Sequence, residues 1–109
     1  MTPTRIAFVD DHPTLLRGMA SLFGSDGLYD IVGTGNSADE AVSLAVEKSP
    51  DVLVVDLSMP GDVFAAFAEI VERAPRTRLL VFTAYADVDK ALRAFDAGAH
   101  AYVLKGRPS

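Results

Sequence analysis

Five short apolar runs alternate along the chain with segments that have helical periodicity. Four of the runs are almost uninterrupted in Val, Ile, Leu, Ala and Phe, a pattern typical of strands buried on both faces of a parallel sheet. The second run contains Asp30 and Gly33 and therefore resembles an edge strand. The predicted strands are residues 5–9, 29–34, 51–55, 78–82 and 101–104.

The segments between these runs carry the usual signals of helix ends. The first begins after Pro13, and the second begins with a capping box in which Ser37 is the N-cap and Glu40 follows three residues later. The third ends before Pro75, and Gly98 closes the fourth. The apolar face of the first helix consists of Leu15, Leu16, Met19, Leu22 and Phe23.

This alternation predicts a single α/β domain. Right-handed crossovers between parallel strands convert it into an open, doubly wound sheet. A chain of 109 residues suffices for one such domain and is too short for two ordinary ones. Because half of the residues are apolar, a sizeable core can form.

Composition excludes several classes of function. The absence of cysteine rules out disulfide scaffolds and thiolate metal sites. No apolar run is long enough to span a membrane and no signal peptide is recognisable, so we expect a cytoplasmic domain. A net charge of −5 without any basic run opposes nucleic-acid binding by this domain itself.

Polar side chains follow the central strands directly. Asp10 and Asp11 follow the first strand. Because the carboxyl ends of parallel strands meet at one edge, where doubly wound sheets bind ligands, we expect these groups to lie together. The residues that follow the third, fourth and fifth strands are Asp56, Thr83 and Lys105.

Three crowded carboxylates repel one another unless a cation joins them, and oxygen ligands with open water positions suit Mg²⁺. A carboxylate can also attack phosphorus to give an aspartyl phosphate. Thr83 and Lys105 would then offer a hydroxyl donor and a positive charge to the added phosphoryl oxygens.

Four motifs cover nearly the whole chain: "VDDHP" (9–13), "VVDLSMPG" (54–61), "VFTAY" (81–85) and "GAHAYVLK" (98–105). In this order they resemble the receiver domain of bacterial two-component response regulators. Within that family, "DDHP", "DLSMPG" and "TAY" most resemble the subgroup with a LuxR-type helix-turn-helix DNA-binding output.

The resemblance implies a flavodoxin-like strand order 2-1-3-4-5 and a role for each residue of the motifs. Asp56 would accept a phosphoryl group from a sensor histidine kinase. Mg²⁺ would be bound by Asp11, Asp56 and the backbone carbonyl of Ser58, with Asp10 acting through a water molecule. The residues implied in phosphoryl binding and switching are Thr83, Lys105 and the aromatic residue Tyr102.

The resemblance also implies a signalling switch rather than a turnover enzyme, although the domain would help catalyse its own phosphorylation and dephosphorylation. Phosphorylation would change the face formed by residues 88–97 and 101–104 and so control an output domain absent from this chain, in transcriptional regulation. The expected partners are the kinase and a second copy, bound through that face or through an uncovered sheet face. Nucleic acid and membrane are not expected partners of this domain.

Three departures from the family pattern are visible. The loop after "MP" is shorter than usual and lacks a second glycine, which makes Asp62 the candidate N-cap of the following helix. Gly106 stands where many receivers have proline, so a cis peptide there would cost ~2.5–4 kcal/mol. The receiver predicted over 1–109 stops before the family's fifth helix, so one sheet face should stay open and the chain should self-associate or be of low stability.

Some alternatives remain open at this level. For His12, a polar loop residue is favoured over a metal ligand or phosphotransfer residue. A phosphorylation-independent interaction module is a second hypothesis for the whole domain. An aspartyl phosphatase of the haloacid dehalogenase type is a third, although "DDHP" lacks the D-x-D spacing of those enzymes.

Overall fold

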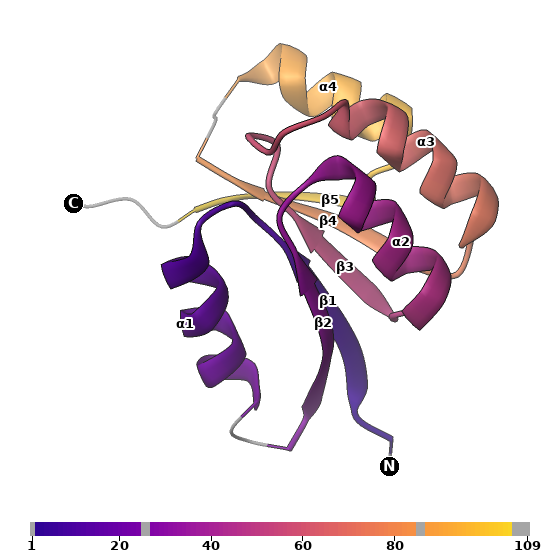
Figure 1. Cartoon of the computed structure of the whole chain (residues 1–109). Helices are drawn as coiled ribbons and strands as arrows, with labels where there is room; N and C mark the ends of the chain where they lie inside the picture. Colours follow the sequence, from indigo (N-terminus) through magenta and orange to yellow (C-terminus); the bar gives the residue numbers. More distant parts are fainter. Residues whose placement is uncertain (1, 25–26, 85–86, 106–109) are drawn as a thin grey trace.

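The computed structural model describes residues 2–24, 27–84 and 87–105, in which strands and helices alternate (Figure 1). The strand bounds agree with the prediction to within one residue at each end. The elements are β1 (Thr4–Val9), α1 (Pro13–Gly24), β2 (Tyr29–Gly35), α2 (Ala38–Lys48), β3 (Val52–Val55), α3 (Val63–Arg73), β4 (Arg78–Thr83), α4 (Val88–Ala97) and β5 (Ala101–Leu104).

The strands form one parallel sheet in the order β2-β1-β3-β4-β5, which confirms the predicted fold. As expected from its polar residues, β2 lies at an edge. Its pairing with β1 is irregular, because Ile6 pairs with Ile31 and Ala7 with Gly33. β1 and β3 are neighbours, so the polar residues that follow them emerge side by side.

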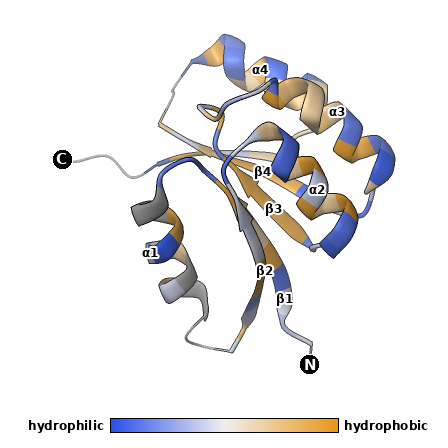
Figure 2. Ribbon diagram, in the orientation of Figure 1, coloured by the Kyte–Doolittle hydropathy of each residue, from blue (hydrophilic) through white to orange (hydrophobic). Residues whose placement is uncertain are grey.

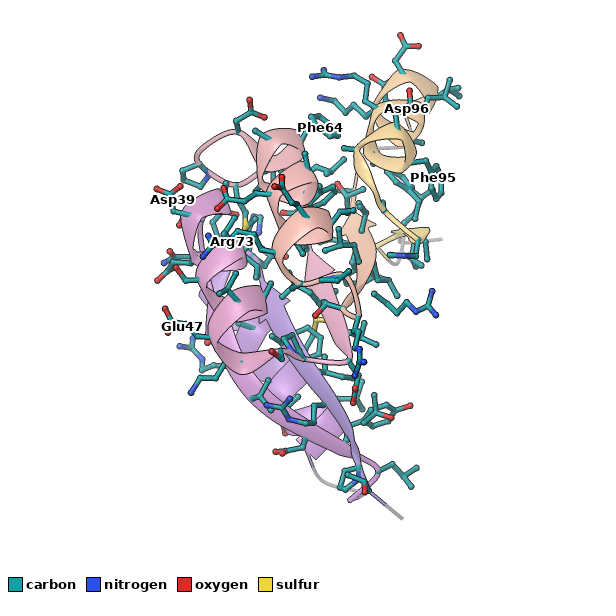
Figure 3. All side chains as sticks on the ribbon, turned by 90° about the vertical axis from the view of Figure 1, so that its right-hand side faces the viewer. Asp39, Glu47, Phe64, Arg73, Phe95 and Asp96 are labelled. Atoms are coloured by element: carbon teal, nitrogen blue, oxygen red, sulfur yellow. The ribbon has the colours of Figure 1, made fainter. Side chains whose placement is uncertain are left out.

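Helices α2, α3 and α4 lie on one face of the sheet and α1 on the other (Figure 1). The main core lies beneath the first three, where alternate residues of β1, β3 and β4 meet Phe67 and Ile70 of α3. Apolar colouring is concentrated on the strands, whereas the outer sides of α2 and α3 are hydrophilic (Figure 2). Asp39 and Glu47 accordingly project away from the ribbon (Figure 3).

The face under α1 is only partly covered. Successive strand residues point to opposite faces, so Phe8, Val54 and Phe82 point toward α1. Phe8 in β1 is buried, whereas Val54 and Phe82 in β3 and β4 remain partly exposed. Leu22, predicted on the apolar face of α1, is 70% exposed and lines a groove with Phe82. The self-association or low stability expected from such a face stays a prediction.

The helix ends follow the capping signals with one difference. Ser37 Oγ accepts a hydrogen bond from the Glu40 N–H at 3.2 Å, which confirms Ser37 as the N-cap of α2. In a capping box the Glu40 carboxylate would accept from the N–H of Ser37. It accepts instead from the N–H of Asn36, one residue earlier, at 2.7 Å. Asp62 caps α3 by accepting from the Ala65 N–H, as predicted.

Gly98, the predicted end of α4, has φ of 123°, and its N–H bonds to carbonyls of the last turn. A Cβ at this position would overlap Val71 Cγ2 of α3. The peptide before Gly106, where a cis bond was considered, lies outside the described residues.

We expect Gly98→Ala to lower the free energy of unfolding by about 1–3 kcal/mol, because alanine is strained at this φ and collides with Val71. Gly18→Ala is the matched control, since a Cβ on this exposed residue of α1 would meet no atom within 4 Å. It should raise stability by roughly 0.5–1 kcal/mol. Urea denaturation measures both, and equal effects of the two substitutions would contradict this account of Gly98.

Candidate functional site

Backbone hydrogen bonds continue the sheet one residue beyond the strands and fix the polar residues there. The N–H of Asp10 donates to the carbonyl of Gly35 at 2.9 Å, and the N–H of Asp56 donates to the carbonyl of Val9 at 2.9 Å. At the same edge, beyond β4 and β5, the N–H of Lys105 donates to the carbonyl of Thr83 at 2.7 Å. The backbone of the sheet therefore fixes the positions of these residues independently of their side-chain contacts.

Two buried carboxylates share one ammonium group at this edge. Lys105 Nζ lies 2.9 Å from Asp10 Oδ2 and 3.4 Å from Asp56 Oδ2. The exposed fractions of Asp10 and Asp56 are only 5% and 2%. A buried carboxylate without a compensating cation is strongly unfavourable, so Lys105 makes the burial of this pair tolerable.

His12 turns its ring toward the acidic residues. Its Nδ1 lies 2.6 Å from Asp10 Oδ1, 3.1 Å from Asp11 Oδ1 and 3.9 Å from Asp56 Oδ2. The hydrogen bond with Asp10 raises the pKa of His12 above its ordinary value of 6.5. Sequence reasoning preferred a plain loop residue here, and only the proximity of His12 to Asp11 along the chain hinted at this contact.

Ser58 contributes a hydroxyl group that sequence reasoning missed. The prediction concerned its backbone carbonyl, but Ser58 Oγ donates a hydrogen bond of 2.5 Å to Asp56 Oδ2. The same carboxylate oxygen thus faces both Ser58 and Lys105. The sequence feature that could have indicated this contact is a serine two positions after Asp56, the candidate nucleophile.

An open cavity of about 360 Å³ exposes the reactive groups to solvent. Ala84, which sequence reasoning did not name, forms part of its wall, whereas Thr83 just before it is completely buried. The residues that line the cavity are Asp11, His12, Asp56, Ser58, Ala84 and Lys105.

Tyr102 lies in a second layer and is partly buried. Its ring centroid is 6.4 Å from that of Phe95 in α4. Burial raises the pKa of Tyr102 above its ordinary value of 10.0, and the charges of Asp87 and Asp56 raise it further. The phenol is therefore sensitive to charge at Asp56 and at the start of α4.

The shortened loop after the acceptor motif is attached to α2. The carbonyl of Pro60 accepts a hydrogen bond from the N–H of Ala38 at 3.0 Å. Gly61 has φ of 97°, and a Cβ there would lie 2.9 Å from Ala38 Cβ. The glycine thus lets the loop approach the first residue of α2.

The residues at this edge fit a divalent cation. Asp10, Asp11, His12 and Asp56 each place one ligand atom within 4.8 Å of the others. The carboxylates supply the oxygen ligands that Mg²⁺ prefers, and the open cavity leaves room for water ligands.

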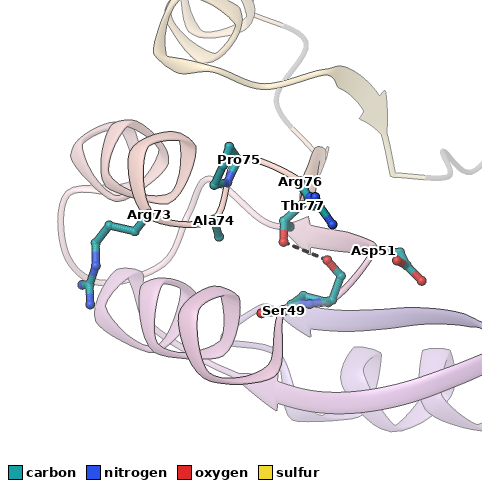
Figure 4. Close-up of a pocket in the computed structure, with 8 residues that line it drawn as sticks. Ser49, Asp51, Arg73, Ala74, Pro75, Arg76 and Thr77 are labelled. Carbon is teal, nitrogen blue, oxygen red and sulfur yellow. Dashed lines mark hydrogen bonds between the residues drawn. The ribbon is translucent and has the colours of Figure 1, made fainter.

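A second cavity, of about 440 Å³, lies at the opposite edge of the sheet (Figure 4). Two of the polar side chains that line it make structural interactions. The hydroxyl of Thr77 donates to the carbonyl of Pro50 at 2.8 Å, and Arg73 pairs with Glu69 at 2.7 Å. The reactive chemistry is therefore found at the carboxyl edge.

Comparison with known proteins decides the family. The model of the response regulator receiver domain matches residues 6–108. The chain belongs to the response regulator receiver family. Receivers are signalling domains rather than turnover enzymes, which confirms that prediction and makes the phosphatase hypothesis wrong.

Similar curated proteins include transcriptional regulators. The chain is 34% identical over 102 residues to the transcriptional regulatory protein LiaR of Bacillus subtilis, covering 93% of this chain and 48% of that protein. It is 35% identical over 102 residues to the DNA-binding transcriptional activator DevR/DosR of Mycobacterium tuberculosis, covering 93% and 47%. The receiver thus spans about half the length of the curated relatives it matches.

Solved structures of response regulators have a fold similar to that of this chain. A LuxR-family two-component response regulator from Aurantimonas sp. superimposes with a TM-score of 0.85 at 37% identity, covering 94% of this chain and 74% of that one. The receiver domain of a putative NarL from Mycobacterium tuberculosis gives 0.91 at 27% identity, covering 99% and 88%. These matches confirm the resemblance to the LuxR-type subgroup. Among the described residues, none of the helices combines the length and apolarity needed to traverse a bilayer.

The His12–Asp10 pair predicts a pH-dependent stability of the metal-free protein. Burial raises the pKa of Asp10, but hydrogen bonds from Lys105 and His12 outweigh it and leave the pKa below 3.8. The contribution of Asp10 is therefore present above about pH 3.8 and lost as the pH falls through the lowered pKa. The contribution of His12 is present in full below about pH 6.5. It is lost as the pH rises through the raised pKa of His12 in the folded protein.

The pair should thus stabilise the fold most between roughly pH 4 and 6.5. We expect His12→Gln to lower the melting temperature at pH 5.5 in the presence of a chelator and to have little effect at pH 8.5. Thermal denaturation followed by circular dichroism measures the difference. An equal decrease at both pH values would show that the ion pair is not responsible.

Proposed function

We propose that this receiver is a phosphorylation-controlled switch in which Asp56 accepts a phosphoryl group from the phosphohistidine of a sensor histidine kinase. The observation that carries the proposal is the position of Lys105 Nζ, 3.4 Å from the buried Asp56 carboxylate at the floor of an open cavity. A nucleophilic oxygen and a cation suited to phosphoryl oxygens thus occupy one site.

In the transfer, an oxygen of Asp56 attacks phosphorus while the bond from phosphorus to the imidazole nitrogen of the donor breaks, and the electron pair leaves with that nitrogen. Mg²⁺, held by Asp11, Asp56 and the carbonyl of Ser58 with Asp10 in support, would neutralise charge on the phosphoryl oxygens. Lys105 would exchange its contact with Asp10 for one with the phosphoryl group. The Ser58 hydroxyl would release Asp56 Oδ2 or donate to the new group.

The signal would leave the site through Thr83, Tyr102 and α4. A phosphoryl group adds about −1.5 to −2 charges beside these elements. The charges of Asp87 and Asp56 help to raise the pKa of Tyr102. Asp87 also caps α4, because its carboxylate accepts a hydrogen bond from the N–H of Asp89. The charge added to Asp56 by phosphorylation would therefore shift the positions of Tyr102 and α4.

The outer face of α4 and β5 has the character of an interaction surface. Several large apolar side chains are exposed there, which is unusual unless a partner covers them. We propose that this face binds a second copy or an output domain. The exposed apolar residues on α4 are Val88 (71% exposed), Leu92 (58%) and Phe95 (46%), and Phe95 contacts Tyr102 of β5.

We further propose that residues 1–109 are the receiver part of a cytoplasmic transcriptional regulator whose DNA-binding domain lies outside this sequence. The support is that similar proteins act in transcription: LiaR is a transcriptional regulatory protein and DevR/DosR is a DNA-binding transcriptional activator. The net charge of −5 agrees with DNA binding by another segment.

Incubation with acetyl phosphate and Mg²⁺, followed by intact-mass measurement, tests the phosphoacceptor. We expect one added phosphoryl group on the wild type and none on Asp56→Ala, because the nucleophile is lost. Asp39→Ala is the matched control, since Asp39 is an exposed aspartate on α2 outside the cavity, and it should be labelled like the wild type.

An unlabelled wild type, or equal labelling of Asp56→Ala, would contradict the proposal. The first result would favour the phosphorylation-independent interaction module. That alternative has less support, because an interaction module has no need for the buried Asp10, Asp56 and Lys105 network.

A further inference from the structure

We propose that His12 is a fourth ligand of the metal site, through Nδ1, and that it lets the site bind divalent transition ions such as Co²⁺ in addition to Mg²⁺. The inference rests on the proposed function in one respect, namely that the carboxyl edge of the sheet is a cation site. It adds a nitrogen ligand to the oxygen ligands of the proposed Mg²⁺ site.

The distance from Nδ1 to the Asp11 oxygen is that of neighbouring atoms in a coordination shell. With metal–ligand bonds of about 2.0–2.2 Å, adjacent ligand atoms lie roughly 3–3.5 Å apart. Nδ1 lies 3.1 Å from an oxygen of Asp11, within that range, and 3.9 Å from an oxygen of Asp56. The 2.6 Å contact with Asp10 Oδ1 is a hydrogen bond that a bound cation would replace. A cation bound between Asp11 and Asp56 therefore lies within reach of Nδ1 after small side-chain movements.

The backbone holds His12 in this place. Its N–H donates to Asp10 Oδ1 at 2.9 Å, and its carbonyl accepts from the N–H of Leu16 at 3.1 Å, in the first turn of α1. His12 is thus fixed between the end of β1 and α1. Its side chain is 60% exposed, which leaves space for water ligands on the solvent side.

Asp10 presents its two oxygens to different partners. Oδ2 contacts Lys105 Nζ, whereas Oδ1 faces the imidazole of His12. A cation beside Oδ1 and Nδ1 would therefore leave the contact between Asp10 and Lys105 intact. This arrangement separates the metal side of the site from the ammonium side.

The ligand types determine which ions respond to His12. Oxygen ligands suit Mg²⁺, whereas imidazole favours later first-row divalent ions. Loss of His12 should accordingly weaken Co²⁺ binding much more than Mg²⁺ binding. The chain has two histidines, and the other, His100, lies at the far end of β5, where its Nδ1 accepts from the N–H of Leu79 at 3.0 Å.

The test is calorimetric titration of the chain with Mg²⁺ and with Co²⁺, using the wild type, His12→Ala and His100→Ala as the matched control for nonspecific histidine binding. We expect His12→Ala to lower the Co²⁺ affinity at least about tenfold and to change the Mg²⁺ affinity far less. His100→Ala should retain both affinities. Circular dichroism at the titration pH verifies that each variant is folded.

Proton NMR of the Co²⁺ form gives a readout independent of affinity. A ligating imidazole should produce a strongly shifted ring N–H signal, present in the wild type and His100→Ala and absent in His12→Ala. Unchanged Co²⁺ affinity in His12→Ala, equal losses for both ions, or a shifted signal that survives in this variant would overturn the proposal. If acetyl phosphate and Mg²⁺ still label Asp56 in the wild type, such a result refutes the role of His12 alone; absent labelling refutes the proposed function.

Discussion

The structure depends on the burial of two aspartates next to each other at the carboxyl ends of β1 and β3. Asp10 and Asp56 are almost inaccessible, and Lys105 Nζ contacts both. Burying like charges is costly, and that cost falls only when cations are close. The fold supplies Lys105 from β5 and His12 from the loop before α1, and it leaves one side open to a further cation.

The sheet gives this arrangement its precision. The strand order places β1 and β3 together at the centre, and backbone bonds hold Asp10, Asp56 and Lys105 beyond the ends of the strands. The core beneath α2 and α3 stabilises the sheet, while α1 covers the opposite face only in part. Asp56 therefore lies between this packed core and Tyr102 of β5, whose pKa its charge helps to raise and whose ring contacts Phe95 of α4.

Much of this was predictable from sequence, because it depends on patterns of several residues. Apolar runs located the strands, and the residues after them located Asp10, Asp11, Asp56 and Lys105. What escaped prediction depends on single side-chain rotamers and loop geometry. The ring of His12 and the hydroxyl of Ser58 turn toward the carboxylates, and Glu40 caps Asn36 instead of Ser37. Such choices differ by about a hydrogen bond and leave no periodic signal in the sequence.

A Mg²⁺ titration followed by backbone amide NMR shifts tests whether the ends of β1 and β3 form one cation site. We expect saturable shifts centred on residues 10–12 and 56–58, abolished by Asp11→Ala in a protein that stays folded. The absence of saturable shifts at these residues, or an unchanged response in Asp11→Ala, would contradict this expectation.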